Sequence, residues 1–455
     1  MAKSLQEVLV ECREHDIKAV ALHVTDILGR WHQMTIPVSR LTEESFEDGF
    51  AWTVNRQAAE RGHLSDVLLI PIPSTAFVEP FADPPTLGLL CTMHDPVTRE
   101  ELPEDPRTVA SKAEKYARES GVAEEILFSV TAEFFLFDST KNARRSRSTP
   151  AATDDDTLEE LDVPRGRFLM GGMHDDFRNA LMHALIDCGV PILSHRQSPI
   201  DPCKSLLQLG EASLVDAADR LMLTKHIVKR LAIRAGKSAT FMPFPQAGRQ
   251  PARMPIQLSL LKHGNCVLTG AGYAGLSDAG THAIGGLLRH AAAIVALTNS
   301  TTNSFAGLGA CSDSLPQIAY SQSDLRATVR IPSLSPSKNK CLEFRPPDAA
   351  CNPYLAFTAL LMAAIDGVQN KISPGQPLDP QPYAAPETLS TTYAQVPASF
   401  EAALMALEND GEFLIRGDVL SPEVLENWLR HKQLIDIQSL RSQAHSHEIA
   451  LYYDI

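Results

Sequence analysis

The longest apolar run of the chain limits what it can fold into. Residues 353–365, PYLAFTALLMAAI, begin a segment that we predict to be a helix continuing through DGVQNK. The run falls well short of the roughly 20 apolar residues that a helix needs to cross a bilayer, so we expect no membrane span. The chain has 455 residues, too many for one ordinary core. We therefore expect two domains, with three as the alternative.

Charge and cysteine usage narrow the class of protein. The net charge is −14 and the pI is near 5.5, which argues against nucleic acid or an anionic membrane as the main partner. The eight cysteines show no CxxC or zinc-finger spacing, and we find no signal peptide. We therefore expect reduced thiols and a cytoplasmic protein.

The pattern of strands and helices predicts an α+β fold. AVALHVTDILGRWHQMTIPV is typical of a hairpin within a region of short strands that fills the first 100 residues. A helix is predicted over 105–121 and a buried strand over 126–138. Further helices are predicted at HDDFRNALMHALIDCG, SLVDAADRLMLTKHIVKRLAIRAG and 284–298, two neighbouring strands at LRATVRIPS and KCLEFRPPD, and a strand-like end at IALYYDI. We predict a small β domain over 1–103 and a larger strand-and-helix domain over 104–455.

Several long motifs resemble the glutamine synthetase family, bacterial class I type, along essentially the whole chain. They include DVLLIPIPSTAFVEPF, AEFFLFD, KSATFMPFP and LEFRPPDAACNPYLAFTALLMAAIDGVQNKISPG. The resemblance implies an N-terminal β-grasp-like domain and a C-terminal catalytic-type domain. It also implies two stacked hexameric rings, with each pocket between adjacent subunits. The family uses ATP to phosphorylate the γ-carboxylate of glutamate, and ammonia then displaces the phosphate. Two divalent metal ions position these groups.

Most of the metal ligands that the family would place in this pocket are replaced. Glu133 and Glu343 remain, one at each metal site. The positions where the family has glutamates or histidines carry other residues here, namely Thr131, Pro199, Leu206, Pro255 and Gln257. One carboxylate is too little to hold a magnesium ion against water. The sequence therefore predicts a lost metal site and no cofactor, neither magnesium or manganese nor ATP.

The substrate-handling positions of the family have changed in the same way. Its catalytic acid, flap glutamate and two glutamate-binding arginines are replaced by Thr53, Ser314, Gly307 and Leu325. Three basic residues persist at phosphate- and substrate-handling positions, namely Arg330, Lys338 and Arg345. They form either an internal ion-pair network with Glu133 and Glu343 or a site for a small anionic ligand, since paired guanidinium groups suit carboxylates and phosphates.

Few groups remain as candidates for other chemistry. Glu133, Glu343 and Cys203 are the candidate catalytic residues. Cys203 lies eight residues after His195, which allows a nucleophilic Cys–His pair, whereas the structural alternative is an ordinary buried thiol.

Three functional hypotheses follow. The first is a glutamine synthetase-like pseudoenzyme that has lost ligation and keeps a structural, regulatory or ligand-binding role in nitrogen metabolism. Its partners would be other copies of itself in a ring, an active homologue or a small anion. The second is a repurposed, metal-independent enzyme acting on a small acid, amine or acyl substrate. The third is a divergent ATP-dependent γ-glutamyl–amine ligase.

Overall fold

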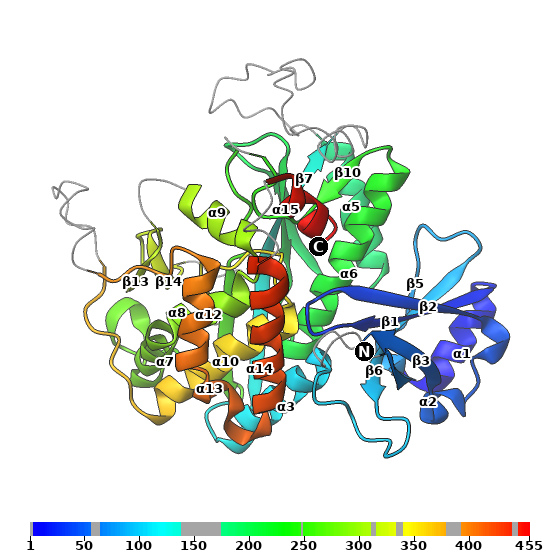
Figure 1. Cartoon of the computed structure of the whole chain (residues 1–455), viewed down its shortest axis with the longest axis horizontal. Coiled ribbons are helices and arrows are strands. Elements are labelled where there is room, and N and C mark those ends of the chain that lie inside the picture. Colours follow the sequence, from blue (N-terminus) through cyan, green and yellow to red (C-terminus); the bar gives the residue numbers. More distant parts are fainter. Residues whose placement is uncertain are drawn as a thin grey trace.

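The computed structural model describes residues 3–55, 64–137, 174–246, 249–310, 315–333, 340–378, 393–438 and 445–455. Two mixed layers of sheet and helix lie side by side, with the N-terminal sheet packed against one flank of the larger C-terminal body (Figure 1). The fold is therefore α+β, as predicted. No helix in these ranges is long and apolar enough to cross a membrane.

The N-terminal part is one sheet with a helix on its face. In its described residues the strand order is β2-β1-β6-β4-β3, with β5 paired to β6. The elements are α1 (Leu5–Glu14), β1 (Ala19–Thr25), β2 (Trp31–Pro37), α2 (Ser45–Asp48), β3 (Phe50–Asn55), β4 (Leu64–Pro71), β5 (Phe77–Val78) and β6 (Thr86–His94). The capping box of Ser4 and Glu7 opens α1, a helix that the sequence analysis did not predict.

The predicted hairpin is confirmed as β1 and β2, which pair antiparallel from Ala19↔Pro37 to Thr25↔Trp31. Its turn needs Gly29, whose φ is +84°. A Cβ built on Gly29 would lie 2.9 Å from the Cα of Asn352 in the C-terminal part. The turn therefore fixes the hairpin against the start of the long apolar helix.

The C-terminal part is built around a second sheet, ordered β13-β14-β15-β11-β7-β9-β8 in its described residues, with β10 on β7 and β12 on β11. Its strands are β7 (Glu125–Phe137), β8 (Ile192–Gln197), β9 (Lys204–Leu209), β10 (Ser238–Thr240), β11 (Ile256–Lys262), β12 (Asn265–Cys266), β13 (Gln317–Ser321), β14 (Ala327–Arg330) and β15 (Leu342–Phe344). The strands predicted at LRATVRIPS and KCLEFRPPD are confirmed as the antiparallel neighbours β14 and β15.

Helices cover this second sheet. They are α3 (Pro106–Glu119), α5 (Asp175–Asp187), α6 (Leu214–Arg234), α7 (Asp278–Arg289), α8 (Ala291–Thr298), α9 (Thr302–Ala310), α10 (Pro353–Gln369), α12 (Phe400–Asn409), α13 (Glu412–Ile415), α14 (Pro422–His431) and α15 (His445–Tyr452), with a π-helical segment at Lys432–Gln438. The single helix predicted over 284–298 is instead the pair α7 and α8, which meet at His290.

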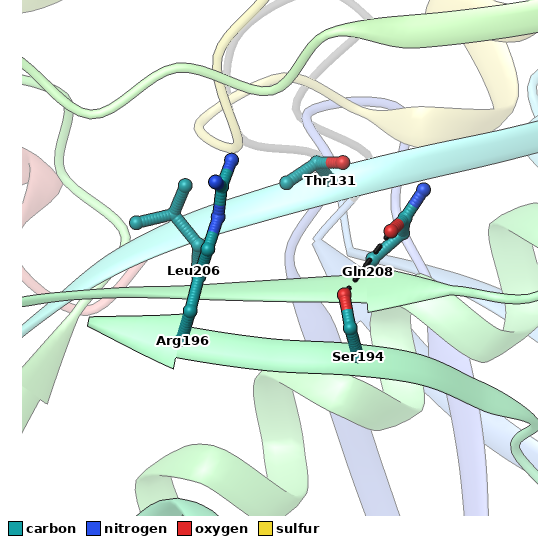
Figure 2. Close-up of a pocket in the computed structure, with 5 residues that line it drawn as sticks. All are labelled: Thr131, Ser194, Arg196, Leu206 and Gln208. Carbon is teal, nitrogen blue, oxygen red and sulfur yellow. Dashed lines mark hydrogen bonds between the residues drawn. The ribbon is translucent and has the colours of Figure 1, made fainter. Parts of the chain in front are cut away.

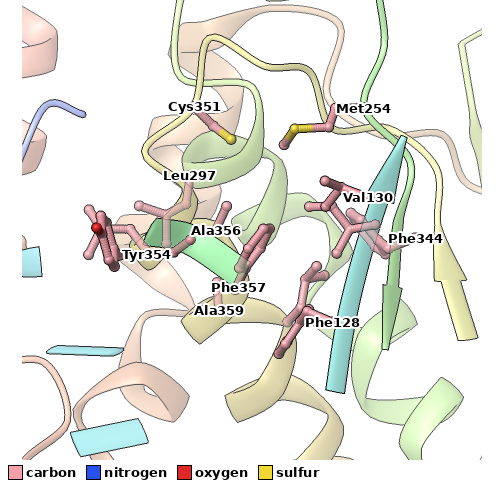
Figure 3. Packing of buried hydrophobic residues seen from close by; sticks show 14 of the residues in the cluster. Phe128, Val130, Met254, Leu297, Phe344, Cys351, Tyr354, Ala356, Phe357 and Ala359 are labelled. Carbon is pink, nitrogen blue, oxygen red and sulfur yellow. The ribbon is translucent and has the colours of Figure 1, made fainter. Parts of the chain in front are cut away.

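The core lies between the central strand β7 and α10. Residues Pro353–Gly367 of α10 are all buried, and the ring of Phe357 stacks on Phe128 of β7 with centroids 4.9 Å apart. Figure 3 shows Phe128, Val130 and Phe344 facing this helix. Because side chains alternate along a strand, Thr131 and Glu133, at odd positions of β7, face the other side of the sheet from Phe128 and Val130.

One predicted element is wrong. IALYYDI was expected to be strand-like, but its first four residues form the end of α15, and its last three follow the helix. Ile449 and Tyr452 are three residues apart, and both are buried in a small cluster with Met242. A helical spacing of three brings both side chains to one face, and this packing outweighs the strand propensity of the isoleucine and tyrosines.

Candidate functional site

A small cavity lies on the face of β7, β9 and β8 that looks away from the α5 and α6 helices. Its volume is about 250 Å³, and its lining is Thr131, Ser194, Arg196, Leu206 and Gln208. The strand register brings these together, since Thr131 pairs with Gln208 and Gln208 with Ser194, while Leu206 pairs with Arg196. Figure 2 shows the three strands and these side chains on one face.

Arg196 faces the cavity beside Leu206, one of the positions where the sequence predicted a lost ligand. Pro199, the other such position in this region, lies in the exposed turn between β8 and β9. The residue of β8 that pairs with Leu206 is Arg196. Among the described residues, no hydrogen bond or ion pair holds the Arg196 guanidinium.

Glu133 is held by a lysine that the sequence analysis did not select. The Nζ of Lys204 lies 2.8 Å from Glu133 Oε2, and the two side chains are 8% and 15% exposed. The same Nζ donates to the carbonyl of Pro251 at 2.9 Å. The backbone N–H of Arg253 donates to Glu133 Oε2 at 3.1 Å. The carboxylate is thus neutralised and hydrogen-bonded within the protein.

Glu343 is held by both of the predicted arginines that the structure describes. Arg330 donates to its two oxygens at 2.9 and 3.0 Å, and Arg345 donates to Oε1 at 2.8 Å. Gln257 adds a donor at 3.1 Å. Burial by itself raises the pKa of Glu343, but the hydrogen bond from Arg330 and the charges of both arginines outweigh it and hold the pKa below its ordinary value.

The other predicted positions do not line this cavity or fall outside the described residues, although the carbonyl of Pro255 accepts the backbone N–H of Thr131 at 3.3 Å. Thr53 donates to Asp66 at 2.7 Å on the N-terminal sheet, and Leu325 is 61% exposed. Gly307 is buried in α9. Pro255 immediately precedes β11. Lys338 and Ser314 fall outside the described ranges.

Among the described residues, the His195 ring forms its hydrogen bond with an asparagine and not with Cys203. The Nε2 of His195 lies 3.1 Å from Asn179 Oδ1 on α5. Its neighbours Ser194 and Arg196 line the cavity, so His195 belongs to the opposite face of β8. Burial lowers the pKa of this imidazole. A catalytic role for Cys203 therefore stays a prediction.

The residues missed by sequence analysis, namely Lys204, Gln208, Ser194 and Arg196, share one signal. Lys204 and Gln208 alternate with the predicted position Leu206 along β9, and Ser194 and Arg196 alternate along β8. This period of two places each set on one face of a strand. The alternation was present in the sequence, although only the strand register shows that both sets meet Thr131 and Glu133.

Comparison with known proteins matches both parts of the chain to one family. Residues 16–96 match the model of the glutamine synthetase beta-Grasp domain, and residues 103–452 match that of the glutamine synthetase catalytic domain. The chain belongs to the glutamine synthetase family. It is 35% identical to the glutamine synthetase of Frankia alni, with both chains covered completely. It is also 35% identical to that of Aquifex aeolicus, with 99% of each covered.

Solved structures agree with the fold of the family. A structure described as "Apo GmaS without ligand" superposes with a TM-score of 0.79 at 26% identity, covering 98% of each chain. The glutamine synthetase of Plasmodium falciparum superposes with a TM-score of 0.82 over 99% of each chain. Its identity of 20% supports the fold alone.

The expectation that this protein has no cofactor is wrong. The full-length relatives are named glutamine synthetase, and the matched catalytic domain belongs to a family that works with ATP and divalent metal ions. The replaced ligands were therefore not sufficient ground to exclude both cofactors.

The described side chains nevertheless do not fit the family's metal ions. In the ranges that the structure describes, no three His, Cys, Asp or Glu residues gather as a metal-binding group. Glu133 and Glu343 bind lysine and arginine instead.

Proposed function

We propose that this member of the glutamine synthetase family does not join ammonia to glutamate and serves a structural, regulatory or small-ligand-binding role. One observation carries the proposal. The two carboxylates that remain at the family's metal positions are each paired with protein cations, Glu133 with Lys204 at 2.8 Å and Glu343 with Arg330 and Arg345.

The charges around the two carboxylates support this proposal. Phosphoryl transfer needs positive charge that binds the transferring phosphate and the acceptor together. Here the positive groups beside Glu133 and Glu343 form ion pairs with these carboxylates. At two further ligand positions Thr131 and Leu206 supply a hydroxyl and an alkyl group, and Arg196 beside them adds a positive charge. The groups at these positions therefore differ from those that the family resemblance implies.

The larger assembly is part of the same proposal. We propose a ring-shaped homo-oligomer, two hexamers in the form that the family resemblance implies, with a homologue as a further partner. The domain division after residue 103 is proposed on similar ground. It falls in the connection between β6, which ends at His94, and α3, which begins at Pro106.

Neither alternative function is favoured by a contact in the described part of the chain. Metal-free chemistry would need a nucleophile beside a general base, and the lining supplies two hydroxyls, from Thr131 and Ser194, beside an arginine, a leucine and a glutamine, none of which is such a base. An ATP-dependent γ-glutamyl–amine ligase would need a charge arrangement for phosphoryl transfer, which the paired carboxylates do not supply.

The test is phosphate release from ATP by the purified protein with Mg²⁺ or Mn²⁺, glutamate and ammonium, beside an active glutamine synthetase. We expect no release above the level without glutamate. Turnover that depends on both glutamate and ammonium would overturn the proposal. A parallel series in which amines replace ammonium separates the ligase alternative from background hydrolysis.

A further inference from the structure

We infer that the cavity bounded by Arg196, Gln208, Thr131, Ser194 and Leu206 binds a small organic monocarboxylate, with Arg196 as the group that holds its carboxylate. This inference deepens the proposed function and rests on it. It assigns a class of ligand to a pocket that, in the proposed function, does not join ammonia to glutamate. It also moves the anion site away from Arg330 and Arg345, whose guanidinium groups are taken by Glu343.

The guanidinium of Arg196 is the charged group of this cavity. It is exposed, and in the described ranges no side chain or carbonyl pairs with it. A guanidinium offers a planar fork of N–H donors that matches the two oxygens of a carboxylate. Arg330 and Arg345 show this use within the chain itself, since they bind the two oxygens of Glu343.

The polar neighbours of Arg196 are arranged as donors. Ser194 Oγ donates to Gln208 Oε1 at 3.1 Å, which fixes the amide so that its Nε2 is left for the cavity. Figure 2 shows this Nε2 and the Arg196 guanidinium extending away from the strands on the same side as the Thr131 hydroxyl. An anion with acceptor oxygens matches this set, whereas a cation does not.

Size and polarity narrow the anion further. The cavity of about 250 Å³ corresponds to roughly eight water volumes of ~30 Å³ each. Leu206 supplies an apolar wall beside Arg196, which suits a short alkyl chain. Glu133, the β7 neighbour of Leu206, is neutralised by Lys204, so one negative charge on the ligand balances Arg196. A phosphate would bring excess negative charge and place oxygen against Leu206.

Butyrate labelled with ¹³C at the carboxylate is the probe, titrated into the full-length protein without ATP or metal and followed by NMR and calorimetry. Butylamine, which has the same alkyl chain with the opposite charge, and inorganic phosphate are titrated in parallel. We expect saturable binding of butyrate that is tighter than that of either comparator. Phosphate binding more tightly than butyrate, or no binding of butyrate at all, would overturn the inference.

Variants locate the site. Arg196→Gln should weaken butyrate binding at least tenfold, and Gln208→Leu should weaken it by a smaller factor. Arg118→Gln removes an arginine that is 51% exposed on α3 and should leave binding unchanged. Because Arg196 is exposed and unpaired, its variant should unfold at the same temperature as the wild type. Equal butyrate affinity in Arg196→Gln would contradict the assignment.

The two proposals fail separately. Phosphate release that depends on glutamate and ammonium would remove the proposed function, whatever the butyrate titration gives. Absence of both turnover and butyrate binding would remove the ligand assignment alone.

Discussion

At the scale of single residues, the chemistry of the candidate site depends on which cation pairs with each of the two carboxylates, Glu133 and Glu343. Glu133 and Lys204 face each other from β7 and β9, and both are largely removed from water. A buried ion pair contributes little net stability compared with apolar residues, but removal of one partner leaves the other charge uncompensated. Lys204 is therefore the residue whose loss should be felt most strongly at Glu133.

Lys204→Met should lower the free energy of unfolding by about 3 kcal/mol, because Glu133 keeps its burial and loses its cation. The double variant Lys204→Met/Glu133→Gln should recover most of this loss. Urea unfolding at neutral pH measures both. The matched control is Lys115→Met, whose lysine is 71% exposed and 3.8 Å from Glu119, where an effect within about 0.5 kcal/mol is expected. Equal losses in the two single variants would contradict the role given to Lys204.

At the scale of elements, strand pairing decides what the residue types alone cannot. The alternation in β7 predicts that Thr131 and Glu133 share a face, and the family motifs identify this face as the pocket. Neither feature shows which residues of β9 lie beside Thr131 and Glu133. A slip of one residue in the pairing of β9 would turn Lys204, Leu206 and Gln208 to the opposite side. The hairpin β1–β2, the helix α10 and the pair β14–β15 were predictable from local pattern. Lys204 and Arg196 required the register Glu133↔Leu206↔Arg196.

The same register predicts how carboxylates could be restored to this face. In Thr131→Glu/Leu206→Glu/Arg196→Gln, two new carboxylates would join Glu133 on adjacent strands, and the repelling guanidinium would be gone. We expect Mn²⁺ to bind at least tenfold more tightly than to the wild type, because hard divalent cations select clustered carboxylates. Electron paramagnetic resonance of free Mn²⁺ measures the affinity. The variant with glutamine at all three positions is the control, and equal Mn²⁺ affinity in both variants would contradict the register argument.

A second element-scale feature is the break between α7 and α8. His290 stands at the position between the two helices, and its Nδ1 and Nε2 lie 2.8 Å from Asp410 and 3.0 Å from Asp366. Burial by itself lowers the pKa of His290, but the hydrogen bonds to Asp410 and Asp366 outweigh it, and the pKa is raised above its ordinary value. The imidazolium therefore stabilises the junction.

This raised pKa fixes the direction of a pH effect. A group whose pKa is higher in the folded state contributes stability that is complete below its unfolded pKa of about 6.5 and is lost as pH rises through the folded value. The difference in unfolding free energy between wild type and His290→Gln should therefore be larger at pH 6 than at pH 9. Urea unfolding across this range measures it. A difference that stays constant, or grows toward pH 9, would show that the proton on His290 does not stabilise the junction.

At the scale of the whole molecule, a small polar cluster joins the N-terminal sheet to the C-terminal body. Glu79, just after β5, lies 3.0 Å from His226 Nε2 on α6 and 3.5 Å from His23 Nε2 on β1. Trp31 of β2 stacks on His23 with ring centroids 4.3 Å apart. Asn352 adds a contact at the start of α10 through its amide, which donates to two backbone carbonyls of the β1–β2 turn. The docking of the two parts therefore depends on Glu79 more than on any other charge in this cluster.

Glu79→Gln should loosen this docking at neutral pH and have no effect in strong acid. Burial by itself raises the pKa of Glu79, but the hydrogen bonds from His226 and the nearby imidazole of His23 lower it to about 2. A carboxyl group whose pKa is lowered in the folded state contributes stability above its unfolded value, and that stability is lost as pH falls through the folded value. The window therefore runs from about 4.5 to about 2. We expect Glu79→Gln to cost about 2 kcal/mol at pH 7 and progressively less below pH 4.5.

Hydrogen exchange at pH 7 places this loss in the molecule. Amides of β1, β2 and β5 should exchange faster in Glu79→Gln than in the wild type, because the N-terminal sheet would open away from α6 without unfolding of the C-terminal core. Amides of β7 and α10, which pack against each other in that core, should keep their protection. The control is Asp16→Asn, since the Asp16 carboxylate is 81% exposed and pairs with Lys18 on the surface. If β7 and α10 lose protection together with the N-terminal sheet, the two parts unfold as one cooperative unit. Glu79 would then stabilise the whole chain and not only the contact between the two parts.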